Sequence, residues 1–244
     1  MKKINAVYVS LAALVLAIAA LVMCFVCCCG KKGASSTDVA KALNDNPQLV
    51  VDALNNYQAQ QRAEAEERAR KAVTENLEDI NNYAGSAVMG NPEGKVTLVE
   101  FFDYSCGYCH RIYPVLKNII AKNPDLRVVL KELAFVNPKI SSYAARAALA
   151  ANEQGKYSEM YTALFEAKGP LTEAKIDELA KVAGVDVEKM KTDMDSAKVK
   201  ATMEHTSNLA GKINVNGVPT LIIGGKVVQT LSEDEIQAAI DAAK

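Results

Sequence analysis

The stretch that decides the fold of this chain is Val96-Thr97-Leu98-Val99-Glu100-Phe101-Phe102-Asp103-Tyr104-Ser105-Cys106-Gly107-Tyr108-Cys109. Its first half, residues 96–103, has the apolar, β-branched and aromatic character of a buried strand. Its second half opens a segment in which apolar residues recur at helical spacing, at Ile112, Val115, Leu116 and Ile119. A C-x-x-C pair at a strand-to-helix junction indicates a dithiol redox centre.

The position of Cys106 at the start of the expected helix gives this interpretation a physical basis. Unpaired N–H groups and the positive end of the helix dipole favour the thiolate of a cysteine placed there. Cys109 lies one turn further in, where we expect it to be close enough to form a disulfide and too buried to compete for substrate. The remaining cysteines, Cys24, Cys27, Cys28 and Cys29, all lie in the N-terminal apolar run, so the pair is available for reversible chemistry.

Length and charge narrow the functional classes. The chain has 244 residues, enough for one sizeable domain with appended segments. Its 28 basic and 29 acidic residues give a net charge of −1. This balance gives no electrostatic sign of a nucleic-acid partner, and we expect none.

Residues 1–34 are typical of a targeting segment. Lys2 and Lys3 precede an uncharged, mostly apolar run over residues 4–29, and Lys31 and Lys32 follow it. As a helix this run would span roughly 39 Å, more than the ~30 Å of a bilayer core, whereas a cleaved signal has an apolar core of about 7–15 residues. We therefore expect a signal anchor in the inner membrane, with cleavage near residues 33–35 or lipidation of a cysteine as alternatives. In each case the remainder would be exported to a bacterial periplasm or cell envelope, an oxidising compartment.

Residues 35–84 are predicted to form a separate helical segment. Ser36 or Thr37 suits the cap of a short helix, and Pro47 suits the first turn of a longer one. Apolar residues recur at helical spacing up to Tyr57, whereas residues 58–71 are polar on all sides, which is typical of a solvent-crossing spacer. We expect homo-oligomerisation through residues 37–57. The alternative is that these helices pack on the globular domain or on the membrane surface.

Residues 85–244 are predicted to form the main domain. After a linker over residues 85–94, strands are expected at 96–103 and 126–135, on either side of the helix that carries the C-x-x-C pair. A helical insertion over about 138–213 follows, with helices expected at 142–153, 157–167, 172–183, 187–194 and 197–210. A hairpin turning at Gly224-Gly225 and a helix opened by a capping box at 232–235 complete the order. This order predicts an α/β, thioredoxin-like fold that carries a helical insertion.

The sequence resembles the DsbA-like branch of the thioredoxin superfamily over roughly residues 86–244. The resemblance rests on Gly-Asn-Pro at 90–92, on the stretch 96–109, and on Asn-Gly-Val-Pro-Thr at 216–220. With its N-terminal helical extension, the chain is most similar to the oligomeric ScsC-type members. These are exported thiol–disulfide exchange proteins whose extension joins the subunits.

The resemblance implies a role for each matching residue. Cys106 would be the nucleophilic cysteine and Cys109 the resolving one, and together they would form the redox-active disulfide. Pro219 would be the family's cis-proline, and with Val218 and Thr220 it would form the loop on which a substrate strand docks. The resemblance implies neither a metal nor an organic cofactor.

Glu100 matches a buried acidic residue that helps to move protons at the resolving thiol. The residue is unusual on physical grounds as well. A carboxylate in an apolar core strand is costly unless it has a partner or a raised pKa. The alternative is an outward-facing strand residue, as simple alternation allows.

The residues around the dithiol give conflicting indications of whether the protein oxidises client thiols or isomerises client disulfides. Gly107 and Tyr108, which we expect to contact substrate, form the dipeptide of the isomerase DsbC, whereas Val218 before the proline is typical of the oxidase DsbA. DsbA carries a histidine within its dipeptide, but here Tyr108 takes that place and His110 lies just outside. We expect a potential between those of DsbA, roughly −120 mV, and thioredoxin, roughly −270 mV.

The sequence therefore predicts an exported enzyme that forms or isomerises disulfides, as an oligomeric isomerase-like protein or alternatively as a monomeric DsbA-like oxidase. Its expected partners are unfolded or misoxidised exported proteins and a membrane redox partner that re-oxidises or reduces the dithiol. Clients, redox partner, subunit number and the fate of residues 1–34 stay open at this point.

Three other interpretations are open. Cys106 to His110 also satisfies C-x-x-C-H, the c-type haem attachment pattern, with Met203 or His205 as a sixth ligand. A structural zinc site would need four ligands, and a single C-x-x-C is a weak indication of one. The chain could also be a non-enzymatic surface chaperone in which the dithiol is incidental.

Overall fold

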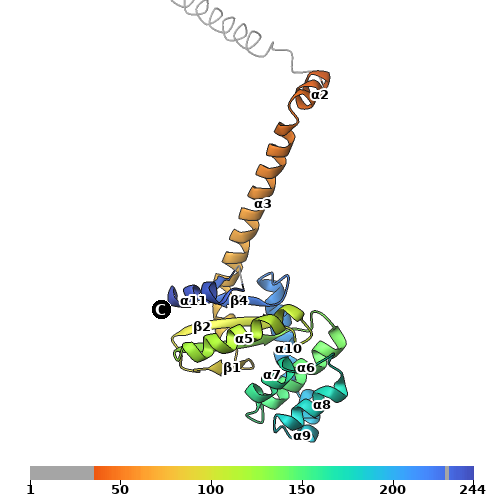
Figure 1. The fold of residues 1–244 in the computed structure, drawn as a ribbon, viewed down its shortest axis with the longest axis vertical. Coiled ribbons are helices and arrows are strands. Elements are labelled where there is room, and N and C mark those ends of the chain that lie inside the picture. Colours follow the sequence, from red (N-terminus) through yellow and green to blue (C-terminus); the bar gives the residue numbers. More distant parts are fainter. Residues whose placement is uncertain (1–35, 229–230) are drawn as a thin grey trace, which may run out of the picture. The chain divides into compact units, whose positions relative to one another are not determined.

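The computed structural model describes residues 36–228 and 231–244, and the chain divides into two compact units after Arg62. The described part of the first unit contains α2 (Ser36–Asp45) and the start of α3 (Gln48–Glu75). The second unit, Ala63–Lys244, contains the end of α3 and all later elements (Figure 1). The expected anchor over residues 4–29 lies outside the described residues. Within the described residues, no helix is both long and apolar enough to cross a membrane.

A mixed sheet forms the centre of the second unit. In the described chain its strand order is β1-β3-β2-β4-β5. The strands β2 and β3 are parallel, and every other neighbouring pair is antiparallel. The strands are β1 (Ala87–Gly90), β2 (Val96–Phe102), β3 (Leu126–Glu132), β4 (Thr220–Ile223) and β5 (Lys226–Val227).

Alternation along the central strands gives the sheet two apolar faces. Leu98 and Phe102 of β2 pack with α5 (Gly107–Lys122) and α11 (Glu233–Asp241), together with helices of the insertion. Val99 and Phe101 pack on the opposite face with the end of α3, with α4 (Leu77–Asn82) and with α10 (Ala197–Lys212). The strand that precedes the C-x-x-C pair is therefore covered on both sides.

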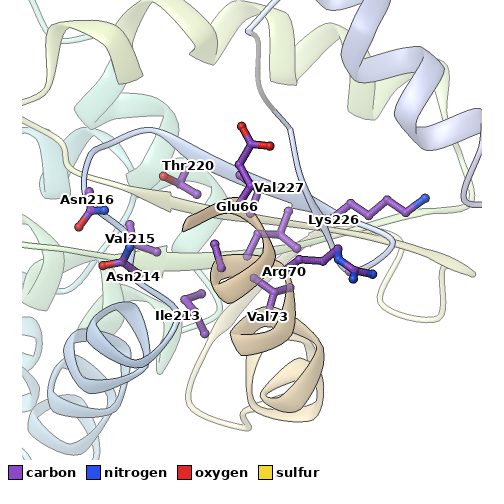
Figure 2. Close-up of a pocket in the computed structure, with 13 residues that line it drawn as sticks. Glu66, Arg70, Val73, Ile213, Asn214, Val215, Asn216, Thr220, Lys226 and Val227 are labelled. Atoms are coloured by element: carbon purple, nitrogen blue, oxygen red, sulfur yellow. The ribbon is translucent and has the colours of Figure 1, made fainter. Parts of the chain in front are cut away.

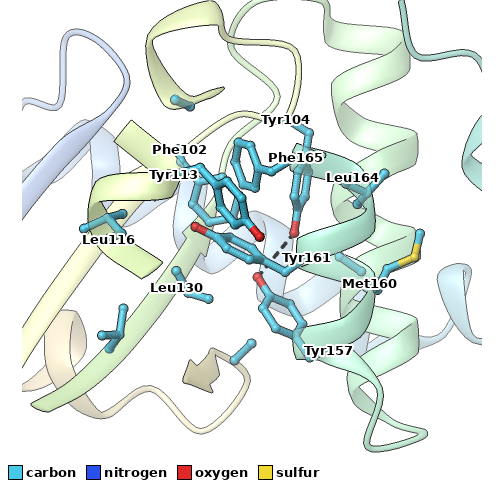
Figure 3. Close-up of a cluster of buried hydrophobic side chains, with 14 of the residues drawn as sticks. Phe102, Tyr104, Tyr113, Leu116, Leu130, Tyr157, Met160, Tyr161, Leu164 and Phe165 are labelled. Carbon is cyan, nitrogen blue, oxygen red and sulfur yellow. Dashed lines mark hydrogen bonds between the residues drawn. The ribbon is translucent and has the colours of Figure 1, made fainter. Parts of the chain in front are cut away.

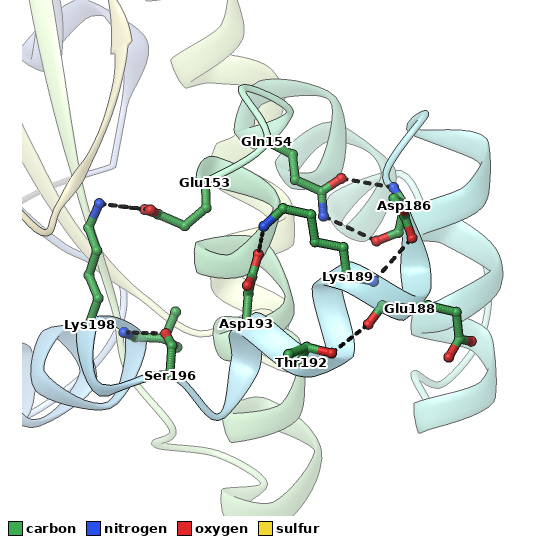
Figure 4. A network of polar contacts seen from close by, with 10 residues as sticks. Glu153, Gln154, Asp186, Glu188, Lys189, Thr192, Asp193, Ser196 and Lys198 are labelled. Carbon is green, nitrogen blue, oxygen red and sulfur yellow. Dashed lines mark hydrogen bonds and ion pairs between the residues drawn. The ribbon is translucent and has the colours of Figure 1, made fainter.

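The helical insertion follows β3 and gathers beside the sheet (Figure 1). Its helices are α6 (Pro138–Asn152), α7 (Tyr157–Phe165), α8 (Glu173–Val182) and α9 (Val187–Met194), which lead into α10. Polar side chains tie them together at the surface (Figure 4). The Gln154 amide donates to the Asp186 carbonyl at 3.1 Å and accepts from the Asp186 N–H at 2.9 Å, and Lys198 pairs with Glu153 at 2.7 Å. These contacts fix the helices that cover one end of the sheet.

The expected order of elements is found, with one additional strand. The hairpin turns at Gly224 and Gly225, whose φ values of 55° and 75° are ones that glycine adopts readily. The segment 85–94, expected to be a linker, contains β1, which pairs antiparallel with β3. Gly90 ends this strand at φ 72°, where an added Cβ would lie 2.5 Å from the Leu126 carbonyl oxygen. A four-residue strand is too short to show alternation in the sequence.

The predicted helical segment 35–84 is interrupted after Glu75. The long helix α3 stops there, and Asn76, whose side chain donates to the Ala72 carbonyl at 2.8 Å, separates it from α4. Val73 and Ile80 are 1 % and 0 % exposed, in the cluster that also contains Phe101. Residues 63–84, assigned from the sequence to the helical segment, thus pack with the domain that was expected to begin at residue 85.

Candidate active site

The C-x-x-C pair lies where the sequence predicts it. Cys106 is the N-cap of α5, with φ −86° and ψ 118°, and its carbonyl accepts from the His110 N–H at 3.0 Å. The Cys106 thiol donates to the Val218 carbonyl oxygen at 3.4 Å, and the Val218–Pro219 peptide bond is cis. The fold therefore brings together the first cysteine and the proline loop, which are 112 residues apart.

The two thiols differ in accessibility, and the inner one has a perturbed pKa. Both cysteines are free in this structure, with Cys106 5 % exposed and Cys109 fully buried. Burial, with a smaller contribution from the Glu100 carboxyl, raises the pKa of the Cys109 thiol well above its ordinary value. Attack from solvent is consequently directed to Cys106, whereas Cys109 favours its protonated form.

Asp103, which the sequence analysis did not select, holds the turn that precedes Cys106. It is 1 % exposed, and its Oδ1 accepts from the Ser105 N–H at 2.7 Å. Its Oδ2 accepts from the N–H groups of Phe135 and Val136, each at 2.7 Å. The bond to Ser105 is an Asx turn, which the Asp-x-Ser spacing could have indicated. The bonds to the loop after β3 have no local signal in the sequence.

Exposed apolar side chains lie on the segments that Asp103 joins. Phe135 and Val136 are both more than half exposed. Tyr108, between the two cysteines, is 60 % exposed, and the Arg111 guanidinium lies 4.1 Å from its ring centroid. Gly107 is exposed beside it. In the proline loop the Thr220 hydroxyl donates to the Gly217 carbonyl at 2.8 Å, which fixes the end of the loop.

Glu100 points into the core, so the outward-facing alternative is wrong. Its side chain is fully buried, and the Tyr161 hydroxyl donates to its Oε2 at 3.0 Å. Burial, reinforced by the nearby Glu132 carboxyl, raises the pKa of Glu100 to about 8 despite the Tyr161 hydrogen bond. The other oxygen, Oε1, has no hydrogen-bond partner among the described residues.

A second buried carboxyl, Glu132, was missed by the sequence analysis. It is 1 % exposed, ends β3, and accepts a hydrogen bond from the Tyr157 hydroxyl. Burial raises the pKa of Glu132 to about 7. The Tyr104 hydroxyl donates in turn to that of Tyr157 at 3.5 Å (Figure 3). The signal that could have found Glu132 is its alternation along β3, which places it on the face occupied by Leu130.

A pocket of about 400 Å³ lies beside the proline loop (Figure 2). Asn216 and Thr220 line it on the side of the loop, Val227 on the side of the hairpin, and Arg70 on the side of α3. It is open space next to the loop that contains the cis peptide bond. No local pattern in the sequence indicates this pocket, because its walls come from distant parts of the chain.

The geometry does not favour the haem interpretation. The two ring nitrogens of His110 lie 3.0 Å from the Phe165 carbonyl oxygen and 2.8 Å from the Tyr104 carbonyl oxygen, so each nitrogen faces the protein's own backbone. His205 stacks on Tyr83, with ring centroids 3.6 Å apart. Both histidines contribute to packing in this structure.

Known proteins match the part of the chain that forms the second unit. The thioredoxin family model matches residues 82–242. The chain is 29 % identical over 175 residues to disulfide bond formation protein D of Bacillus subtilis, covering 64 % of this chain and 76 % of that protein. It is also 31 % identical over 143 residues to the Na(+)/H(+) antiporter NhaA 1 of Mycolicibacterium gilvum, covering 57 % of this chain and 23 % of that protein. The chain thus spans about a quarter of the length of this antiporter.

Solved structures extend the likeness to three dimensions. A thioredoxin-like oxidoreductase from Silicibacter pomeroyi superimposes with a TM-score of 0.65 at 35 % identity, over 68 % of this chain and 96 % of that one. The catalytic domain of Proteus mirabilis ScsC superimposes with a TM-score of 0.64 at 25 % identity, over 71 % of this chain and 97 % of that one.

Proposed function

Because the chain belongs to the thioredoxin family, in its DsbA-like branch, we propose that it is an exported thiol–disulfide oxidoreductase acting on client proteins through Cys106 and Cys109. One observation carries the proposal. The thiol of Cys106 lies at a helix N-terminus, 3.4 Å from the carbonyl of Val218, while Cys109 is fully buried one turn away. This arrangement separates an attacking sulfur from a resolving one.

The oxidising direction starts from the Cys106–Cys109 disulfide. A client thiolate attacks the Cys106 sulfur, the S–S bond breaks, and its electron pair goes to the Cys109 sulfur, which takes up a proton. The second client thiol, as its thiolate, then attacks the client sulfur of the mixed disulfide. A client disulfide forms, and Cys106 leaves as a thiolate.

The isomerising direction starts from the dithiol. The Cys106 thiolate attacks a wrong client disulfide and forms a mixed disulfide, and a client thiolate released in this step attacks elsewhere until the pairing changes. Cys109 can displace a client that stays bound, leaving the client reduced and the enzyme oxidised. The burial of Cys109 supports this assignment, because it keeps that thiol from reacting with clients directly.

The proline loop is the proposed docking site for a client strand. Val218 is partly buried and directs its carbonyl to the Cys106 sulfur, so a chain that pairs with this loop would bring its own sulfur to the reacting atom. Pro219 and Thr220 complete the loop. Tyr108 and the neighbouring Gly107 offer exposed surface on the other side of the dithiol.

Glu100 is the proposed proton donor and acceptor for Cys109. Its pKa of about 8 keeps it protonated at neutral pH, and its carboxyl influences the acidity of the Cys109 thiol. A neutral acid at this position can supply the proton that the Cys109 sulfur needs when the disulfide opens. It can take that proton back when the disulfide re-forms.

We further propose that residues 37–57 join several copies of the chain, as expected for an ScsC-type isomerase. Support comes from large apolar side chains that are exposed on α2 and the start of α3, with Leu49 55 % and Tyr57 61 % exposed. Exposed apolar side chains repeated along a helix favour association. The other large apolar side chains that are exposed in this segment are Val39, Leu43, Val50, Val51 and Leu54.

Residues 4–29 are the proposed membrane anchor. A membrane protein is the proposed redox partner of the dithiol.

A trapping experiment tests the exchange mechanism. The Cys109→Ala variant should accumulate mixed disulfides with clients, seen as adducts on gels that disappear on reduction, because the resolving thiol is gone. Cys106→Ser is the matched control and should form none. Absence of adducts with Cys109→Ala would contradict the exchange mechanism and favour the non-enzymatic alternative.

Direction and association are tested together by comparing residues 36–244 with residues 63–244, which keep Val73 and Ile80 in the core. The longer protein should be oligomeric by light scattering and, when reduced, should reactivate a test protein with scrambled disulfides. The shorter one should be monomeric and lose this reactivation. A monomeric longer protein that rapidly oxidises reduced clients without reactivating scrambled ones would establish the alternative, a DsbA-like oxidase.

A further inference from the structure

The two buried carboxyls lie on one face of two neighbouring strands. In the parallel pair β2–β3, Glu100 is opposite Leu130 and Phe102 is opposite Glu132. Side chains two residues apart on a strand share a face, and the strand spacing and rise place the two Cα atoms roughly 8 Å apart. Glu100 and Glu132 therefore form a diagonal pair beneath the helix that carries Cys109.

One helix provides a hydrogen-bond donor for each carboxyl. Tyr157 and Tyr161 are one turn apart on α7, with ring centroids separated by 6.1 Å. The Tyr161 hydroxyl donates to Glu100 and the Tyr157 hydroxyl donates to Glu132. Each carboxyl still has one buried oxygen with no partner among the described residues, Oε1 of Glu100 and Oε2 of Glu132. Each therefore has a site at which a proton can be held.

One nearby charge, that of Lys131, lowers the pKa of Glu132, but burial outweighs it and the pKa of Glu132 stays raised. Tyr104, after β2, faces the pair as a third phenol, and Cys109 faces it from α5. Lys131 is adjacent to Glu132 in sequence, but its ammonium group donates to Ser86 Oγ at 2.8 Å and to the Asp79 carbonyl at 3.1 Å. Its position in β3 directs it to the other face of the sheet. Two like charges this close and this buried repel each other strongly, so ionisation of one opposes ionisation of the other.

Both carboxyls are shielded from water. Glu132 is 1 % exposed and Glu100 is fully buried, and the unpartnered oxygen of each is buried as well. Glu100 lies on the central strand β2, which has neighbours on both sides. Burial of both groups strengthens the effect that the charge of one has on the other.

We propose that Glu132 is a positioning residue for thiol–disulfide exchange, whose carboxyl forms a pair with that of Glu100 and keeps Glu100 protonated as the proton donor to Cys109. The proposal rests on the proposed function. When a client thiolate opens the disulfide, the electron pair goes to the Cys109 sulfur and Glu100 transfers its proton to that sulfur. Closure of the disulfide returns the proton from Cys109 to Glu100.

The pair has a defined dependence on pH. The pKa values of about 7 for Glu132 and about 8 for Glu100 mean that Glu132 loses its proton first as the pH rises. Its negative charge then opposes ionisation of Glu100, which stays protonated to a higher pH. Without a charge at position 132, Glu100 should ionise at a lower pH, and proton supply to Cys109 should fail earlier.

The test is the pH profile of disulfide opening in the full-length protein. The disulfide form is reduced with glutathione from pH 5 to 9, and each rate is divided by the concentration of glutathione thiolate. The wild-type rate should fall above neutral pH, and in Glu132→Gln the midpoint of this fall should move down by roughly one pH unit. At pH 5 the two rates should agree within about twofold. Glu159→Gln, which removes an exposed carboxyl from the same helix α7, is the matched control and should leave the midpoint unchanged.

A second variant and a second measurement complete the test. Tyr157→Phe removes the hydrogen bond that favours ionised Glu132, so it should move the midpoint in the same direction, and it serves if Glu132→Gln does not fold. Infrared spectra at pH 7 should show one protonated-carboxyl band fewer in Glu132→Gln. Unchanged midpoints in the folded variants, even with uniformly slower exchange, would overturn the proposal. Absence of exchange in the wild type would instead contradict the proposed function.

Discussion

Two consecutive residues at the end of β3, Lys131 and Glu132, are buried on opposite faces of the same sheet. The lysine is well partnered: its ammonium group bonds to Ser86 and to the Asp79 carbonyl and lies 5.5 Å from the Tyr83 ring centroid. The carboxyl face, with Glu132 and Glu100, has phenol donors but leaves one oxygen of each carboxyl unmatched. A buried charge whose bonds are satisfied fixes a structure, whereas buried acids with spare oxygens are suited to hold and release protons.

The two faces should also respond to pH in opposite ways. Glu100 has its pKa raised from 4.5 to about 8, so between these values the folded state binds more protons than the unfolded one, and stability falls as pH rises through that window. Glu132 acts in the same sense between 4.5 and about 7. Lys131 has its pKa lowered from 10.5 to about 8, mainly by burial, so the folded state binds fewer protons there and stability rises from pH 8 to 10.5.

The largest expected effect comes from removing the reacting sulfur, which belongs neither to Lys131 nor to the carboxyl pair. Cys106→Ser should abolish all measurable exchange, because the reacting sulfur is lost, yet it should change the free energy of unfolding by less than about 1 kcal/mol. Exchange assays and urea unfolding measure the two quantities. Residual exchange in this variant would show that another group carries the reaction.

Glu100→Gln tests the carboxyl face. It should slow disulfide opening at pH 7 by about 100-fold, because a positioned acid is replaced by a group that cannot supply a proton. The fall in stability between pH 5 and 8 should become smaller by on the order of 3 kcal/mol, since Glu100 no longer titrates. Stopped-flow reduction and urea unfolding across that range give the answer. If this variant opens its disulfide at the wild-type rate, Glu100 does not supply the proton.

Lys131→Ala tests the opposite face. It should lower the free energy of unfolding by about 3 kcal/mol, because it creates a cavity and removes the donor to Ser86 and to the Asp79 carbonyl. The gain in stability from pH 8 to 10.5 should disappear. Because the Lys131 charge lowers the pKa of Glu132, its loss should move the pH midpoint of disulfide opening down, by less than Glu132→Gln does. A midpoint that moves up would contradict this coupling between the two faces.

The smallest expected effect tests the hydrogen bond that the Tyr161 hydroxyl donates to Glu100. Tyr161→Phe removes the hydrogen bond that lowers the pKa of Glu100, so that pKa should rise further and the fall in exchange rate should move up by about half a pH unit. The free energy of unfolding should drop by about 1 kcal/mol. Movement of the midpoint to lower pH would contradict the assigned direction of this hydrogen bond.

The residues that sequence reasoning found are those with local signals. The strand before Cys106, the C-x-x-C spacing, the Gly224-Gly225 turn and the Val218-Pro219 loop are each recognisable from a few neighbouring residues, and the fold contains all of them. The burial of Glu100 also followed from one carboxylate in an apolar strand.

The features that were missed depend on distant partners. Glu132 gains its significance from Tyr157, 25 residues away, and Asp103 from N–H groups 32 and 33 residues away. Val73 was assigned to the helical segment 35–84, separate from the main domain, and only the completed sheet shows the apolar surface that covers it. A sequence pattern indicates a face, but not what packs against it.

The bonds made by Asp103 bear on how such a protein can change over evolution. Its carboxylate accepts only backbone N–H groups from Phe135 and Val136, so the side chains at these positions take no part in holding the active-site turn. Any residue other than proline can supply the same N–H group. The apolar surface beside the dithiol can therefore diversify toward new clients while the geometry of the reacting cysteines is inherited unchanged.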